Sequence, residues 1–401
     1  MYSDCTLLPK THPTNQEQMS ETKFEIVRPV FPKLSEFERE FSEALRTGAV
    51  TNQSKYVVEF ERELAKYVGV KYCAVFCNGE QALIAMLYAA NLKGEVIVPA
   101  YTYSGTIHAV AWNKGLTPVF ADIDEKTLTI DPKDVAKRIT KKTVAILAAP
   151  FYGNPCDNDA LQKLADKHHI RLFYDSASGC GSRYRGKMVG SFGDAEMFSF
   201  HATKVFTTME GGAVLTNDKK LYEVVTSLRN FGKNYKDADC DYPGFNGKMT
   251  EVCALVGLKL LPSLDKTVLH RDAIASHYIK RLGHIKGFRI QQVQKNSLSS
   301  WLYFQFEVDK VQCGMSRDEL ILELEARKIT GRRFNFPPNH LLTCYKTTKT
   351  VRLPVAERVS ANSIALPVYS DMTFDEASLI SDAVIEVLSK KKKTTKGTPR
   401  D

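Results

Sequence analysis

Residues 71–124 read KYCAVFCNGEQALIAMLYAANLKGEVIVPAYTYSGTIHAVAWNKGLTPVFADID. Short apolar runs rich in β-branched and aromatic residues alternate here with longer helical patterns, and the alternation continues to about residue 216. Strand, helix, strand at this spacing is typical of right-handed crossovers, which place helices on both faces of a sheet. The strand runs are apolar throughout, as expected for strands buried on both faces. This stretch therefore predicts an α/β fold with a mostly parallel sheet.

Four segments of different character make up the chain. Residues 1–22 are polar and show no sustained periodicity, so we expect a flexible N-terminal arm. Residues 23–260 contain the alternating core and predict a large domain. A long helical pattern, a strand run and further helices follow, which predicts a smaller α+β C-terminal domain over residues 261–389. Residues 390–401, KKKKTTKGTPRD, are expected to form a basic disordered tail.

The composition is that of an ordinary globular chain of 401 residues, with 43% hydrophobic and 25% charged residues. No apolar run approaches the roughly 20 residues that a membrane-spanning helix needs, and the N-terminus has no signal-peptide pattern. The nine cysteines include no C-x-x-C pair, so the sequence predicts neither a zinc site nor a disulfide framework. We therefore expect a cytoplasmic protein that enters no membrane and binds no metal.

The net positive charge is concentrated at the C-terminus. The formal net charge is +9, and residues 390–401 supply +5 of it through six Lys or Arg and one Asp. Charge runs usually remain solvated, although binding to an anionic surface is an alternative for this tail. No basic stripe with interleaved aromatic residues supports nucleic-acid binding, so we expect no nucleic-acid partner.

Ligands of open α/β sheets bind beyond the carboxyl ends of the strands, so the residues that follow each apolar run are candidates for a site. RLFYD ends on Asp175, FSFHATK ends on Lys204, and a glycine turn at residues 78–80 opens a helix. Alone, the aspartate could be a turn former and the lysine a surface residue. Together they supply an amine for a Schiff base, a carboxylate for a ring nitrogen and donors for a phosphate, as pyridoxal 5′-phosphate (PLP) requires.

Nine segments in order closely resemble the nucleotide-sugar aminotransferases of the DegT/DnrJ type, a branch of the fold type I, aspartate aminotransferase-like PLP enzymes. These segments are CNGEQAL, VIVPAYTYSGTIHAV, TPVFADID, FYGNPCD, FYDSASGCGS, FSFHATKVFTTMEGGAVLT, LRNFG, GFNGKMTEVCALVGLKLL and LPVAERVSANSIALPVYSDM. The resemblance spans about residues 30–388. It implies that the large domain binds PLP and that its mostly parallel sheet is accompanied by the smaller α+β domain.

The resemblance also implies a role for each matched residue. Lys204 would hold PLP as a Schiff base and later move a proton between the substrate and the cofactor, and Asp175 would pair with the pyridinium nitrogen. Tyr103 would stack on the ring. The implied cofactor-binding residues are Gly79, Glu80, Tyr103, Asp175, Ala177, Ser178, Ser199, Lys204 and Asn246. Asn246 matches an asparagine that reaches the phosphate in the neighbouring subunit, which implies a homodimer with shared active sites.

The chain departs from the family pattern at two of these positions. Glu80 stands where the family usually has Thr, and a carboxylate beside a phosphate is repulsive, so we expect the backbone of this turn to bind. Ser178 replaces the usual His or Gln near the cofactor oxygen. His201 belongs to the lysine motif, where its role is either structural or catalytic, and we expect it among the substrate-binding residues.

The resemblance favours transamination of a nucleotide sugar. The dehydratase branch has histidine in place of the lysine, whereas Lys204 is present here. The segment GRRFNFPP, residues 331–338, resembles members that aminate C4 of dTDP-4-keto-6-deoxyglucose, while the 3-aminating branch typically carries Gly-Ile-His-Tyr-Pro. Arg332 and Arg333 are therefore expected to bind the pyrophosphate or the carboxylate of the amino donor. A charged surface loop is the alternative interpretation.

We expect a homodimeric, PLP-dependent aminotransferase that moves the amino group of L-glutamate to C4 of a dTDP-linked 4-keto-6-deoxyhexose. The product would be a 4-amino-4,6-dideoxy sugar nucleotide of the viosamine type, used in polysaccharide biosynthesis. Amination at C3, or of a GDP- or UDP-linked sugar, is an alternative within the family. A regulatory or binding protein of the same fold without turnover is an alternative of another class, and the intact set Lys204, Asp175 and Ser199 argues against it.

Overall fold

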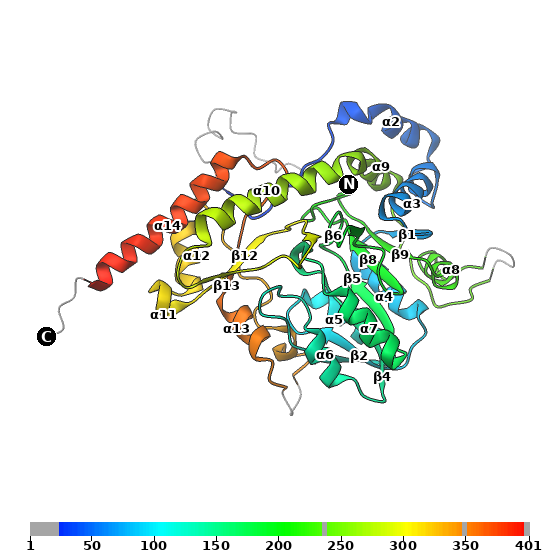
Figure 1. The fold of residues 1–401 in the computed structure, drawn as a ribbon. Coiled ribbons are helices and arrows are strands. Elements are labelled where there is room, and N and C mark those ends of the chain that lie inside the picture. The colour runs from blue at the N-terminus through cyan, green and yellow to red at the C-terminus, as the bar shows by residue number, and fades with distance from the viewer. Residues whose placement is uncertain (1–23, 235–238, 347–350, 397–401) are drawn as a thin grey trace, which may run out of the picture.

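The computed structural model describes residues 24–234, 239–346 and 351–396 (Figure 1). The predicted N-terminal arm, residues 1–22, lies outside the described residues, as do residues 397–401 of the predicted tail.

A seven-stranded sheet in the order β1-β9-β8-β5-β4-β2-β3 forms the centre of the large domain. Its strands are β1 (Tyr72–Phe76), β2 (Gly94–Pro99), β3 (Leu116–Ala121), β4 (Thr143–Ala148), β5 (Arg171–Asp175), β8 (Ala195–Ser199) and β9 (Gly212–Thr216). The neighbouring pairs from β8 to β3 are parallel, and β9 is antiparallel to both β8 and β1. The prediction of a mostly parallel sheet is confirmed.

Helices cover both faces of this sheet. Successive residues of each strand point to opposite sides, so the apolar strands have two faces to bury. Val75 packs with α3 and α9, while Ala74 packs with α4 and α8 on the other face. The helices on that second face are α4 (Gly79–Ala89), α5 (Ser104–Trp112) and α8 (Lys219–Leu228). The first face carries α3 (Lys55–Val68), α6 (Pro132–Arg138), α7 (Asn158–His168) and α9 (Glu251–Leu260). The domain also contains η1 (Leu34–Glu36), α2 (Glu38–Thr47) and η2 (Phe151–Gly153).

The C-terminal part forms a smaller α+β domain around the antiparallel sheet β10-β12-β13. Its strands are β10 (Phe288–Ile290), β12 (Phe304–Val308) and β13 (Ser363–Leu366). Its helices are α10 (Leu264–Leu282), α11 (Lys310–Cys313), α12 (Arg317–Glu325), η4 (Asn339–Leu341), α13 (Pro354–Asn362) and α14 (Phe374–Lys396). A third small sheet joins β11 (Ser297–Leu298) to β6 (Arg183–Tyr184) and β7 (Lys187–Met188) of the large domain.

The helical run α9–η3–α10 crosses from one domain to the other, with Pro262 in η3 (Leu261–Ser263). Leu264 and Val268 pack in the large-domain core, whereas Ile274 belongs to the small-domain core. The predicted boundary after residue 260 therefore falls inside a continuous helical run. The boundary predicted at residue 390 falls inside α14.

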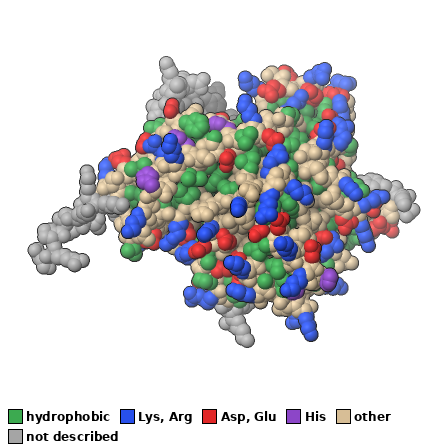
Figure 2. All heavy atoms as spheres, viewed as in Figure 1, with side chains coloured by type: hydrophobic (Ala, Val, Ile, Leu, Met, Phe, Trp, Pro, Cys, Tyr) green, Lys and Arg blue, Asp and Glu red, His purple; other side chains and the backbone are tan. Residues whose placement is uncertain are grey.

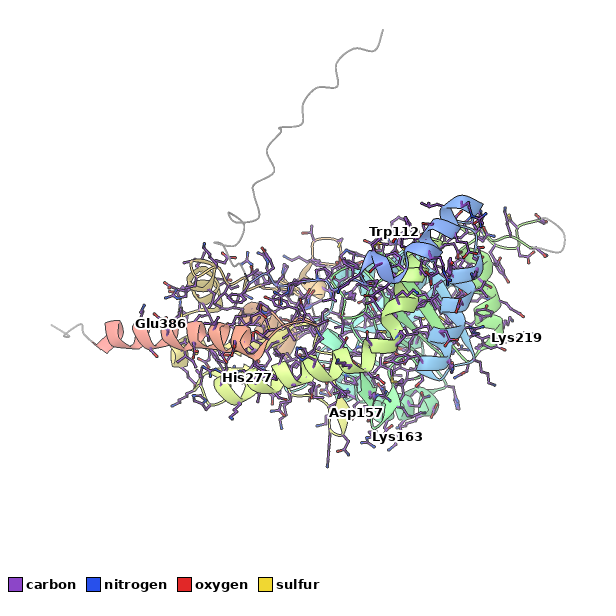
Figure 3. All side chains as sticks on the ribbon, turned by 90° about the horizontal axis from the view of Figure 1, so that it is seen from above. Trp112, Asp157, Lys163, Lys219, His277 and Glu386 are labelled. Carbon is purple, nitrogen blue, oxygen red and sulfur yellow. The ribbon has the colours of Figure 1, made fainter. Side chains whose placement is uncertain are left out.

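The two domains lie side by side (Figure 1). In the view from above, α14 with Glu386 lies at one end of the molecule and Lys219 of α8 at the other (Figure 3). Lys and Arg are interspersed with Asp and Glu on the face shown in Figure 2. None of the helices within the described ranges is both long enough and apolar enough to cross a membrane.

Candidate active site

Asp175 ends β5 and is buried at the carboxyl edge of the sheet, with 7% of its surface exposed. Its Oδ2 accepts a hydrogen bond of 2.6 Å from the Thr106 hydroxyl, and Oδ1 accepts one of 3.1 Å from the amide of Ala177. Burial raises the pKa of Asp175, while these two hydrogen bonds and the charge of Lys204 act in the opposite direction. A cationic ligand at this carboxylate would therefore favour its ionised form.

Lys204 lies in the connection from β8 to β9, and its side chain is half-buried. Its amide donates a hydrogen bond of 2.9 Å to the carbonyl of His201. Burial lowers the pKa of Lys204, and the charge of Asp175 partly offsets this effect. A lower pKa increases the fraction of neutral amine, which is the form that attacks a carbonyl carbon. Because β5 and β8 are neighbours, the loop that carries Lys204 begins at the same edge of the sheet as Asp175.

The predicted phosphate turn lies at the start of α4, where Oδ1 of Asn78 accepts a hydrogen bond of 2.9 Å from the amide of Gln81. The first amides of a helix have no intrahelical partner and attract anions. A Cβ atom added to Gly79 would lie 2.9 Å from the Cβ of Ser199, so the start of α4 packs closely against the end of β8. The structure therefore brings Gly79 and Ser199 together, whereas the side chain of Glu80 is exposed.

Tyr103 immediately precedes α5, and 72% of its surface is exposed. A Cβ atom added to Gly105 would lie 3.1 Å from atoms of the Tyr103 ring, so the ring lies against the first turn of α5. Thr106 in the same turn donates its hydroxyl to Asp175 and its amide to the carbonyl of Tyr103, at 2.6 and 3.1 Å. An open aromatic face in this position is suited to stacking on a planar ligand.

Ser178 and His201 occupy the two loops beside this cluster. The carbonyl of Ser178 accepts a hydrogen bond of 2.8 Å from the hydroxyl of Ser300. His201 is exposed, and its Nδ1 lies 2.9 Å from Oγ1 of Thr203, while Nε2 lies 3.4 Å from the carboxylate of Glu210. These contacts hold His201 within its own loop, and its role in binding substrate stays a prediction.

Asn246 has an exposed side chain in the segment that follows α8. The next residue, Gly247, accepts a hydrogen bond of 2.8 Å through its carbonyl from the amide of Cys77. Cys77 directly precedes the turn that opens α4, so Asn246 lies near the predicted phosphate turn of its own chain. Its contribution to a neighbouring subunit stays a prediction.

Arg332 and Arg333 lie on the surface of the small domain, where they form ion pairs with α12. Nη1 of Arg332 is 3.9 Å from the carboxylate of Glu325, and Nη1 of Arg333 is 3.6 Å from that of Asp318. Arg333 also lies over the ring of Phe336, 5.6 Å from its centroid. These partners orient both guanidinium groups, and their binding of substrate stays a prediction.

Sequence reasoning missed Thr102, Thr106 and Asn339. Thr102 and Thr106 are buried, and their hydroxyl oxygens lie 3.2 Å apart. Two threonines directly after the strand run EVIVPA could have indicated polar groups at this strand end, one before α5 and one in its first turn. Asn339 is distant in sequence, and no local pattern predicts its contact with this region.

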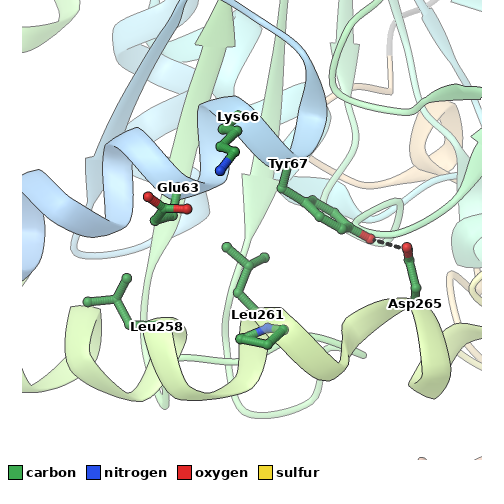
Figure 4. Close-up of a pocket in the computed structure, with 7 residues that line it drawn as sticks. Glu63, Lys66, Tyr67, Leu258, Leu261 and Asp265 are labelled. Carbon is green, nitrogen blue, oxygen red and sulfur yellow. Dashed lines mark hydrogen bonds between the residues drawn. The ribbon is translucent and has the colours of Figure 1, made fainter.

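A separate surface hollow of about 380 Å³ lies between α3 and the α9–η3–α10 run (Figure 4). It is lined by Glu63, Lys66, Tyr67, Leu258, Leu261, Pro262 and Asp265. The Tyr67 hydroxyl donates a hydrogen bond of 2.7 Å to the Asp265 carboxylate, so these two groups bind one another. None of the predicted site residues lines this hollow, and we place the candidate active site at Lys204 and Asp175. In the part of the chain that the structure describes, no three His, Cys, Asp or Glu side chains are arranged to hold a metal ion.

Comparison with known proteins gives relatives along nearly the whole chain. The chain is 34% identical over 363 residues to the dTDP-4-amino-4,6-dideoxy-D-glucose transaminase of Shigella dysenteriae, covering 90% of this chain and 98% of that protein. It is 32% identical over 368 residues to the GDP-perosamine synthase of Escherichia coli O157:H7, covering 90% and 99%. The crystal structure of DesI in the presence of its TDP-sugar product superposes with a TM-score of 0.87 and 33% identity, covering 93% of this chain and 95% of that one.

The sequence pattern of one family matches both domains of the chain. It matches residues 33–385, a range that contains Gly79, Asp175 and Lys204 as well as the small domain. Since the fold is also that of a solved relative, the fold type I architecture expected from the sequence is confirmed. The chain therefore belongs to the DegT/DnrJ/EryC1/StrS aminotransferase family.

Proposed function

We propose that this aminotransferase uses PLP, held at Lys204 and Asp175. The observation that carries the proposal is the buried carboxylate of Asp175 at the end of β5, held by Thr106 and Ala177 and subject to the charge of Lys204 from the loop that follows β8. The start of α4 with Ser199 would hold the phosphate, and Tyr103 would cover one face of the ring. The residues present fit the cofactor. A cationic ring nitrogen would stabilise the ionised form of the buried Asp175 carboxylate, and the start of α4 would stabilise the anionic phosphate.

When bound, PLP supplies an electron sink for the carbon that gains or loses the amino group. The Asp175 carboxylate stabilises positive charge at the ring nitrogen, and Thr106 and Ala177 orient that carboxylate through their hydrogen bonds. The Nζ atom of Lys204 moves the proton at the substrate carbon as a general acid and base. One site would serve two half-reactions, in which an amino donor delivers nitrogen and a keto sugar then receives it.

The substrate we propose is a nucleotide-linked 4-keto-6-deoxyhexose, with dTDP as the nucleotide and L-glutamate as the donor. The Shigella relative carries a C4-amino dTDP sugar in its name, and the segment 331–338 resembles the C4-aminating branch. Arg332 and Arg333 offer guanidinium groups for the pyrophosphate. The second candidate is a GDP-linked sugar, which the resemblance to a GDP-perosamine synthase favours.

We further propose a cytoplasmic homodimer in which Asn246 of one subunit completes the phosphate site of the other. The exposure of its side chain, which leaves it accessible to a neighbouring subunit, supports this role. The product would enter polysaccharide biosynthesis.

The test is a spectrum of the purified protein loaded with PLP, first with glutamate and then with each nucleotide keto sugar. Glutamate should remove the cofactor's visible absorbance, and the accepted keto sugar should restore it. Proton NMR of the product then separates C4 from C3 amination. If glutamate leaves the spectrum unchanged and no other amino acid alters it, the proposed transamination is contradicted.

A further inference from the structure

Two residues of the small domain hold the turn that carries Tyr103. The backbone of Asn339 donates a hydrogen bond of 2.9 Å to the carbonyl of Ala100, and its side-chain Nδ2 donates one of 2.8 Å to the carbonyl of Thr102. Nε2 of Gln305, in β12, donates a hydrogen bond of 2.9 Å to the hydroxyl of Tyr101. Three successive residues at the end of β2 are therefore bound from the other domain.

These contacts are buried, with Asn339 exposed by 3% and Gln305 by 1%. A buried carbonyl that loses its donor carries the full cost of its lost hydration, which makes such contacts selective for one geometry. Asn339 lies in η4, directly after the segment 331–338 that carries Arg332 and Arg333. The loop predicted to bind substrate is thus linked through Asn339 to the turn of Tyr103 by two hydrogen bonds.

The same turn begins a buried chain of hydroxyl groups that ends on Asp175. Thr106 donates its single hydroxyl proton to Oδ2 of Asp175, so it accepts the hydrogen bond that joins it to Thr102. Thr102 therefore donates, and the direction of the chain runs from Thr102 through Thr106 to the carboxylate. Hydrogen bonds aligned in this way polarise and strengthen one another.

We propose that Asn339 is a positioning residue that couples the small domain to the Tyr103 turn and, through Thr102 and Thr106, to Asp175. Its side-chain amide holds the Thr102 carbonyl in place. This fixes the backbone between Tyr103, which carries the stacking ring, and Thr102, whose hydroxyl begins the chain to Asp175. Displacement of the segment 331–338 would be transmitted to both cofactor contacts. The part that concerns the cofactor rests on the proposed function.

The experiment uses the full chain in four forms: wild type, Asn339→Ala, Thr106→Val and the double variant. Asn339→Ala removes the side-chain donor and keeps the backbone bond to Ala100. Thr343→Ala, an exposed change in the same loop, is the matched control. Hydrogen exchange is measured first without cofactor, followed by the dissociation constant of PLP and the pH dependence of its absorbance.

In Asn339→Ala, exchange of the Thr106 amide, which binds the Tyr103 carbonyl, should accelerate on the order of tenfold. The amides of α12 and α14 should retain wild-type exchange. The affinity for PLP should fall on the order of tenfold, and the absorbance should titrate at a shifted pH. Because both residues act on one carboxylate, the effects of Asn339→Ala and Thr106→Val on affinity should be less than additive.

Unchanged exchange at Thr106 in a folded Asn339→Ala protein would overturn the proposal. So would additive effects, or a lower melting temperature with wild-type affinity and absorbance, since these indicate a purely structural role. If Asn339→Ala does not fold, Asn339→Ser is used, because its hydroxyl is too short to replace the amide at Thr102. A wild type that binds no PLP would contradict the proposed function instead, and the exchange measurement would still decide whether Asn339 holds the turn.

Discussion

The hydroxyl of Thr106 lies 2.6 Å from Oδ2 of Asp175 and donates a hydrogen bond to it. This bond joins the first turn of α5 to the end of β5, so the residue beside the predicted stacking ring also orients the predicted partner of the ring nitrogen. A hydrogen bond to a carboxylate favours its ionised form and opposes the effect of burial on the pKa of Asp175. The pKa of Asp175 therefore depends on Thr106, a residue that itself has no charge.

Asp175→Asn should preserve the fold and lower kcat by at least about 100-fold, because a neutral amide cannot stabilise positive charge on the ring nitrogen. Thr106→Val should lower kcat by about tenfold, since it keeps the shape of the side chain but removes the hydrogen bond to Asp175 and the one accepted from Thr102. Single-turnover absorbance with glutamate measures both effects. An unchanged rate in Asp175→Asn would remove the proposed role of this carboxylate.

Lys204→Ala should abolish transamination while the melting temperature stays close to that of wild type, because the side chain is only half-buried. Its amine is required both to hold the cofactor and to move the proton. Product formation by mass spectrometry and thermal unfolding by circular dichroism are the two measurements. Turnover at the wild-type rate would contradict the assignment.

Mixing Lys204→Ala with Asn246→Ala should restore part of the activity, provided that the two inactive variants exchange subunits. One mixed site then carries an intact Lys204 in one subunit and an intact Asn246 in the other. Differently tagged chains, purified in tandem, give defined heterodimers for this assay. Heterodimers with no recovered activity would argue against a shared phosphate site.

Glu196 should make stability depend on pH. It is buried in β8, where its carboxylate accepts hydrogen bonds from the Phe192 amide at 2.7 Å and from the Ser176 hydroxyl. Burial raises its pKa from 4.5 to about 7. A raised folded-state pKa contributes stability below pH 4.5 that is lost as the pH rises through about 7.

Between pH 5 and pH 8, wild type should therefore lose about 2–3 kcal/mol of unfolding free energy relative to Glu196→Gln, at about 1.4 kcal/mol per pKa unit. The glutamine can accept from Phe192 and donate to Ser176, so it retains both contacts. Urea titrations of the two proteins at both pH values measure this difference. Parallel pH dependences would show that Glu196 is not the titrating group.

The sequence was sufficient for the sheet and its strand ends. Apolar runs such as RLFYD identify doubly buried strands, and the rule for ligand position in such sheets then selects Asp175 and Lys204. Local chemistry also identified the start of the helix, because a glycine turn at residues 78–80 directly precedes a helical pattern. These features depend on neighbours in sequence.

Contacts between distant segments could not be predicted in this way. Thr106 meets Asp175 only because β2 and β5 lie on either side of β4, and Asn339 meets Thr102 only because the small domain packs against the end of β2. The domain boundary predicted after residue 260 lies within a helical run, where no break in the local pattern marks a change of domain. Pro262 marks a short 3-10 segment between two α-helices. The helical run leaves the large-domain core and enters the small-domain core only between Val268 and Ile274.

Reduction of the PLP-loaded protein with borohydride, followed by proteolysis and mass spectrometry, tests the central claim most directly. The account predicts that one peptide gains the mass of a reduced pyridoxyl phosphate group and that fragmentation places it on Lys204. It also predicts that Lys204→Ala gives no labelled peptide under the same conditions. An unlabelled wild type, or stoichiometric label on another lysine, would contradict the account.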